Sequence, residues 1–115
     1  MRADLEIIQE WIPAGSRVLD LGCGDGELLA WLSANKQVSG YGLEIDPDKI
    51  AQCIGKGVNV IEQNLDEGLG NFASDSFDVV VMTQSLQALH FPDKGLAEML
   101  RVGKTCIITF PNFGH

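Results

Sequence analysis

The residues most suited to chemistry in this sequence are a run of alternating glycines and the acidic side chain before it. In the stretch RVLDLGCGDGELL, Gly22, Gly24 and Gly26 directly follow a short apolar run. Glycine has no Cβ, so this loop can turn tightly and approach a ligand closely, while the helix after it offers free N–H groups. Asp20 stands two residues before the first glycine, where its carboxylate can hold an ammonium or sulfonium group. The pattern predicts a ligand pocket, although a glycine-rich connection can also be only a tight turn.

Two nucleotide-like ligands compete for such a loop. A dinucleotide-binding loop has the spacing GxGxxG, but its third glycine would fall at Glu27, and the spacing present is GxGxG. Glu44, further along the chain, can accept the two hydroxyls of a ribose on its two carboxylate oxygens. Both ligand classes carry ribose, so Glu44 alone does not separate them. Together with the glycine spacing and Asp20, it favours S-adenosylmethionine over NAD, and a nicotinamide-binding domain is the weaker alternative.

Apolar runs and helical patterns alternate along the chain and predict the elements that position these residues. Strands are predicted over residues 17–21, 40–45, 58–65, 77–83 and 105–110. Helices are predicted over 4–11 and 27–33, from Asp46-Pro47 to Gly55 or Gly57, and ahead of Gly103. Their buried faces are expected to carry Leu5, Ile8 and Ile12; Ile50, Ala51 and Ile54; and Leu96, Met99 and Leu100.

Short links between these elements predict a doubly wound, Rossmann-like α/β fold. Strands that are apolar on both faces fit a parallel sheet with helices on each side. We expect the strand order 3-2-1-4-5 in a single domain over residues 1–115. The ligand is expected at the carboxyl ends of the first two strands, where the chain order reverses.

Composition limits the partners and the compartment. Sixteen acidic residues against eight basic ones give a net charge of -8 over 115 residues, which disfavours nucleic acid and anionic membranes as partners. The N-terminal residues lack the apolar stretch of a signal peptide, and we expect a cytoplasmic protein. Cys23, Cys53 and Cys106 have no CxxC spacing, so they predict buried free thiols rather than a disulfide framework or a metal site.

The motifs resemble those of a known superfamily. The stretches VLDLGCGDGELL and YGLEID resemble the first two motifs of class I S-adenosylmethionine-dependent methyltransferases, and residues 77–112 resemble their fourth- and fifth-strand region. Within that superfamily the whole chain is similar to the MetW family of bacterial methionine biosynthesis, most specifically in LDLGCGDGELL and ITFPNFGH. The resemblance implies S-adenosylmethionine as cofactor and a link to a homoserine O-acyltransferase, whose activity some members support.

The resemblance also implies roles for individual residues. Glu44 would bind the ribose and Ile45 would lie against the adenine, whose edge would meet Asn64 and Leu65. Gln84 and Ser85 would face the transferable methyl group. The methionine end of the cofactor would be lined by Asp20, Gly22, Cys23, Gly24 and Gly26.

Candidates for catalysis are few. Methyl transfer rests largely on alignment of the reactants, and a base is needed only if the acceptor must lose a proton. His90 could serve as that base, and Gln84 is a second weak candidate, although a histidine at the start of a turn is the simpler interpretation of His90. Cys23 could be activated by the adjacent helix N-terminus, but a small side chain that fills a crowded turn is the favoured interpretation.

The chain stops soon after the fifth predicted strand. Class I methyltransferases usually add two further strands, and MetW relatives continue well beyond FPNFGH. We therefore expect a domain truncated at its C-terminus that keeps the cofactor half; if it is complete, its exposed sheet edge invites a homodimer. The leading functional hypothesis is a methyltransferase with an unknown, small-molecule acceptor. The alternative is a non-catalytic, cofactor-binding regulatory partner of a homoserine O-acyltransferase.

Overall fold

The central element of the structure is β1 (Arg17–Leu21), which lies in a five-stranded parallel sheet. This computed structural model describes residues 3–83 and 89–109. β2 (Ser39–Glu44) and β4 (Phe77–Met82) flank β1, while β3 (Val60–Glu62) and β5 (Gly103–Ile108) form the edges. The order β3-β2-β1-β4-β5 confirms the predicted topology.

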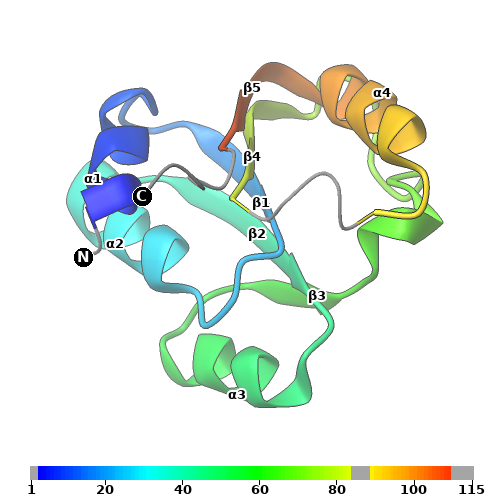
Figure 1. Ribbon diagram of the computed structural model, residues 1–115. Coiled ribbons are helices and arrows are strands. Elements are labelled where there is room, and N and C mark those ends of the chain that lie inside the picture. Colours follow the sequence, from blue (N-terminus) through cyan, green and yellow to red (C-terminus); the bar gives the residue numbers. More distant parts are fainter. Residues whose placement is uncertain (1–2, 84–88, 110–115) are drawn as a thin grey trace, which may run out of the picture.

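Helices cover both faces of this sheet (Figure 1). α1 (Ala3–Glu10), α2 (Glu27–Lys36) and α3 (Pro47–Gly55) contribute to one apolar cluster, and α4 (Pro92–Val102) contributes to the other. Val79 and Val81 of β4 point into the first cluster, whereas Val80 and Met82 point into the second. Successive side chains of a strand point to opposite faces of the sheet, and both faces are covered here, so all four residues are buried. This explains why the strands are apolar on both faces. None of the helices among the described residues is long and apolar enough to cross a membrane.

The start of α3 forms as predicted from its sequence. The Asp46 carboxylate accepts a hydrogen bond of 2.9 Å from the Asp48 backbone N–H, and Pro47 occupies the first helical position. α3 ends at Gly55, and Gly57 follows in the left-handed region with φ 76°. This cap fixes the direction in which the chain leaves the end of β2.

Two predicted helix faces were wrong in part, although Met99 is buried as predicted. In α3 the buried residue is Cys53, while Ala51 is exposed and Ile54 is 66% exposed. In α4 the buried residues are Gly95, Met99 and Val102, and Leu100 is 60% exposed. Gly95 allows the close approach of Leu89, because a Cβ there would lie 2.7 Å from Leu89 Cδ1. The helix is therefore turned toward a small residue that a hydrophobic pattern does not count.

Several predicted boundaries also shift. β3 covers only Val60–Glu62, because the chain turns at Gln63 and Asn64 caps the 3-10 helix η1 (Leu65–Glu67). α2 runs on to Lys36 and stops at Gln37, which has a left-handed φ of 55°. β5 begins at Gly103, immediately after α4, and the predicted end of that strand at Phe110 lies outside the described residues.

Candidate functional site

The glycine loop after β1 makes the tight turn that its sequence predicts. Gly22, Gly24 and Gly26 have φ of 72°, 59° and 84°, all in the left-handed region that favours glycine. At Gly26 space is limiting as well, because a Cβ would lie 3.0 Å from the Cys53 Sγ and 3.1 Å from Val58 Cγ2. At Gly24 a Cβ would meet nothing within 4 Å, so only the backbone angle requires glycine there.

Five N–H groups in this loop and at the start of α2 donate within the protein, and Glu27 N is the one among them that belongs to the helix expected to offer free N–H groups. Gly22 N and Cys23 N donate to Leu43 O at 2.8 and 2.9 Å, and Gly24 N donates to Glu44 Oε1 at 2.9 Å. Gly26 N donates to Cys23 O and Glu27 N to Asp25 Oδ1, both at 3.1 Å. β2 and the Asp25 side chain thus take the place that a phosphate occupies in a phosphate-binding loop.

Glu44 is the buried carboxylate at the end of β2. Only 9% of the residue is exposed, and three backbone N–H groups hold its charge: Gly24 at 2.9 Å on Oε1, and Ile45 and Asp46 at 3.0 Å on Oε2. A carboxylate offers about four acceptor positions, so one remains on Oε1. A ribose diol that binds both oxygens must therefore share Oε2 with the two backbone amides.

A pocket of about 400 Å³ opens beside Glu44, above the carboxyl ends of β2 and β3. It brings together Glu44, Ile45, Asn64 and Leu65, four residues that the sequence analysis predicted to lie at one site. Asn64 Oδ1 caps η1 by accepting the Asp66 N–H at 3.0 Å. The remaining lining is largely apolar and includes Leu21, Leu43, Met82 and Leu89, which suits a flat aromatic ring.

A second pocket of about 320 Å³ opens beside the glycine loop and Thr83. Asp20 lines it and is only 2% exposed. The two pockets share Gly22 and Lys49 in their linings. The site therefore has an apolar compartment and an acidic compartment that meet at the glycine loop.

Six residues that line this second pocket were not predicted as site residues: Leu5, Asp25, Glu27, Leu28, Lys49 and Thr83. Leu5 reaches it from α1, and Lys49 lines both pockets from the first turn of α3. No local pattern places Leu5 there, because its position depends on how α1 packs. For Lys49 the available signal is its closeness in sequence to Glu44 and to the Asp46 cap.

Cys23 packs in the crowded turn, as the favoured interpretation expects. Its Sγ lies 3.7 Å from the Cys53 Sγ, and a Cβ on Gly42 would collide with it. Burial and the nearby Asp20 carboxylate raise the pKa of the Cys23 thiol well above its usual value. The reactive-thiol interpretation, in which the helix N-terminus lowers this pKa, is therefore not supported, because burial first and the Asp20 carboxylate second act in the opposite direction.

His90 lies at η1 and is held there by Asp66. Its Nδ1 is 2.9 Å from Asp66 Oδ2, and its backbone N–H donates to Asp66 Oδ1 at 2.9 Å. The hydrogen bond from His90 lowers the pKa of the Asp66 carboxyl. The imidazole is 83% exposed, and His90 is in the lining of neither pocket. Gln84 and Ser85 lie outside the described residues.

This fold is that of the S-adenosylmethionine-dependent methyltransferases. The chain superposes with a TM-score of 0.78 on a TehB-like methyltransferase of this class from Corynebacterium glutamicum, at 20% identity over 96% of this chain and 62% of that one. A second methyltransferase of the class, from Archaeoglobus fulgidus, is 32% identical with a TM-score of 0.69, over 85% of this chain and 42% of that one.

Residues 2–115 match the family described as methionine biosynthesis protein MetW, and the chain belongs to that family. It is also 41% identical, over 123 aligned residues, to the bifunctional methionine biosynthesis protein MetXA/MetW of Rhodopirellula baltica. The alignment covers 100% of this chain and 20% of that relative. The chain therefore corresponds to about a fifth of the relative's length.

Proposed function

We propose that the chain binds S-adenosylmethionine across the two joined pockets and acts as a methyltransferase on a small-molecule acceptor. The observation that carries the proposal is the division of one site into an apolar compartment beside Glu44 and an acidic compartment around Asp20. An adenosyl ligand with a cationic amino-acid tail has the same division. When bound, the cofactor supplies an electrophilic methyl group on a sulfonium.

The residues fit this cofactor end by end. Ile45 and Leu65 offer apolar surface to the adenine, Asn64 lies at its edge, and Glu44 accepts from the ribose. Asp20 offers a buried negative charge to the ammonium or sulfonium. The backbone beside this charge belongs to Gly22, Cys23 and Gly24. Gly26, the cap of α2, is in the lining of neither pocket.

A dinucleotide fits the same site less well. Its pyrophosphate needs N–H groups of the loop and of the helix start, whereas four N–H groups of this loop and Glu27 N of α2 already donate to protein acceptors. Asp20 and Glu27 would add repulsion, since both line the pocket beside the loop. The contacts therefore favour a ligand whose loop-facing part is cationic.

A second candidate function is regulatory. The relative from Rhodopirellula baltica is named as a fusion of MetXA and MetW, which favours a chain that acts beside a homoserine O-acyltransferase. Within the described residues, neither pocket is lined by histidine or tyrosine, and the two buried carboxylates there, Glu44 and Asp20, are assigned above to the cofactor. Such a partner would use the bound adenosyl ligand as a signal, in the cytoplasm, where the free cysteines stay reduced.

Calorimetric titration with S-adenosylmethionine, S-adenosylhomocysteine and NAD tests the binding proposal. We expect saturable binding of both adenosyl ligands and no heat with NAD; binding of NAD alone would contradict the proposal. Release of S-adenosylhomocysteine in the presence of candidate acceptors then tests methyl transfer. Acyltransferase rates measured with the chain and with its Glu44→Ala variant separate the regulatory role from the catalytic one.

A further inference from the structure

The starting observation is the place of Lys49, which lines both compartments of the site. The charges around it are strongly unbalanced. Glu44 and Asp46 line the apolar compartment, and Asp20, Asp25 and Glu27 line the acidic one. In the described part of the chain, Lys49 is the sole basic residue in either lining.

This imbalance poses a problem for one part of the proposed ligand. The amino-acid tail of an adenosyl cofactor carries a carboxylate as well as an ammonium, and five carboxylates around it repel the former. Backbone donors that could relieve the repulsion are scarce, since Gly22, Cys23 and Gly24 already donate to β2. A positive charge at the junction of the compartments would offset this repulsion and attract that carboxylate.

Lys56, a second lysine near the site, already has an acidic partner. The Lys56 Nζ lies 3.1 Å from Asp25 Oδ2 and donates to the Asp25 carbonyl at 3.1 Å. Within the described residues, Lys49 has neither an ion pair nor a hydrogen bond, although its charge adds to the stronger effect of Lys56 in lowering the pKa of Asp25. Its exposed ammonium is thus available to a ligand in the cleft.

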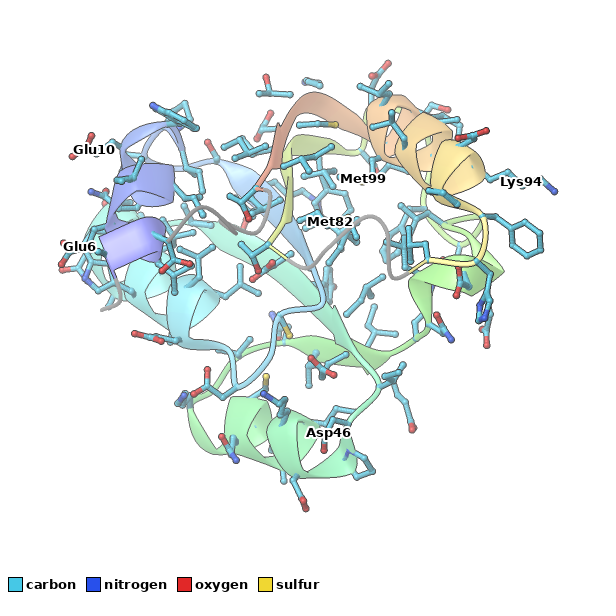
Figure 2. The ribbon with its side chains drawn as sticks, in the orientation of Figure 1. Glu6, Glu10, Asp46, Met82, Lys94 and Met99 are labelled. Carbon is cyan, nitrogen blue, oxygen red and sulfur yellow. The ribbon has the colours of Figure 1, made fainter. Side chains whose placement is uncertain are left out.

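The stability of α3 gives no reason for a positively charged residue at position 49. A cation in the first turn of a helix opposes the macrodipole. α4 begins with the same three residues, Pro92-Asp93-Lys94, as α3 does with Pro47-Asp48-Lys49. There the ammonium of Lys94 lies 5.1 Å from the centre of the Phe91 ring, and Figure 2 shows Lys94 pointing outward from the start of α4.

We propose that Lys49 binds the α-carboxylate of the ligand and so makes the site select adenosyl ligands that keep their amino-acid tail over neutral 5′-thioadenosines. This inference rests on the proposed function, because it assigns one end of the same ligand. Lys49 acts here as a specificity residue: the adenosine part is held by the apolar compartment whether or not the tail is present.

The test compares two ligands on four proteins by calorimetry. The ligands are S-adenosylhomocysteine and 5′-methylthioadenosine, which share the adenosine part and differ in the charged tail. The proteins are the wild type, Lys49→Gln, Lys49→Arg and, as matched control, Lys94→Gln. The two glutamine variants lose the same charge at the same position of a helix, and only Lys49 lines the cleft.

We expect Lys49→Gln to bind S-adenosylhomocysteine about tenfold to a hundredfold more weakly, the range of a lost charged hydrogen bond. Its affinity for 5′-methylthioadenosine should change by less than about twofold, because that ligand has no carboxylate. Lys49→Arg should keep most of the affinity, and Lys94→Gln all of it. Equal losses for both ligands, or no loss for either, would overturn the inference while leaving the proposed function intact. A wild type that binds neither ligand would overturn both.

Discussion

The Oε1 atom of Glu44 accepts a hydrogen bond of 2.9 Å from the backbone N–H of Gly24. This contact joins the end of β2 to the middle of the glycine loop, twenty residues earlier in the chain. The two parts of the site that were recognised separately in the sequence are thus one hydrogen-bonded unit. Glu44 has a structural role in shaping the loop beside its proposed role in binding ribose.

Glu44→Ala is expected to weaken binding of S-adenosylhomocysteine by roughly 1.5–3 kcal/mol, the cost of hydrogen bonds to a charged group. It should also lower the melting temperature, because three backbone N–H groups lose their acceptor. Calorimetry and thermal unfolding measure the two effects. Glu62→Ala is the matched control, since Glu62 is the exposed register partner of Glu44 on β3. An unchanged affinity in Glu44→Ala would reject the ribose assignment.

Alanine at two glycines of the loop should separate backbone strain from crowding. Gly24→Ala should cost about 1–2 kcal/mol, because the left-handed angle alone opposes a side chain. Gly26→Ala should cost more, since its Cβ would also press on Cys53 and Val58 at 3.0 and 3.1 Å. Urea unfolding of both variants provides the comparison, and equal costs would show that the space around Gly26 relaxes freely.

The ion pair between Glu98 and Arg101 should make stability depend on pH. The Arg101 guanidinium lies 2.7 Å from Glu98 Oε1 and also donates to the Leu69 and Phe72 carbonyls, and its hydrogen bond lowers the pKa of Glu98. A carboxyl with a lowered folded-state pKa stabilises the protein above its unfolded pKa, and this contribution is lost as pH falls through the folded value. Glu98→Gln should therefore lower the melting temperature at neutral pH and have little effect in acid. An equal loss at both pH values would contradict this origin.

Thiol labelling should report the burial of the cysteines. Burial raises the pKa of Cys23, Cys53 and Cys106, so all three thiols are protonated at neutral pH. Cys106 is half-buried, whereas Cys23 and Cys53 are buried. Iodoacetamide should modify Cys106 first, and mass spectrometry of digested samples gives the order. Labelling of Cys23 ahead of Cys106 would revive the reactive-thiol hypothesis.

Local signals were sufficient for much of the architecture. The apolar strands, the Asp46-Pro47 start of α3 and the glycines with left-handed angles all depend on neighbouring residues, and all were predicted correctly. The strand order followed from the general behaviour of alternating strands and helices. Glu44 was recognised from its own residue type and position, whereas Ile45, Asn64 and Leu65, which line the same pocket, were expected there only from the family resemblance.

Features that depend on packing between distant segments were not predicted. Leu100 and Ile54 follow a helical apolar pattern, but the faces that pack are set by Gly95 and Cys53. The engagement of the loop N–H groups depends on where the Leu43 carbonyl comes to lie beside β1. Leu43 lies about twenty positions from Gly22 and Cys23 in the sequence, so no local pattern could predict this contact.

The hydrogen bonds between the glycine loop and β2 bear on how the site behaves before a ligand arrives. Leu43 accepts from both Gly22 and Cys23, so the loop continues the bonding of the sheet. Opening the loop requires the end of β2 to open too, and the amide hydrogens of Gly22 and Cys23 should exchange with solvent as slowly as those of the strand. A loop already held in this way loses little conformational entropy on binding. Among the described residues of the cleft, the glycine loop is thus held in place before binding, whereas Lys49 contributes an exposed side chain.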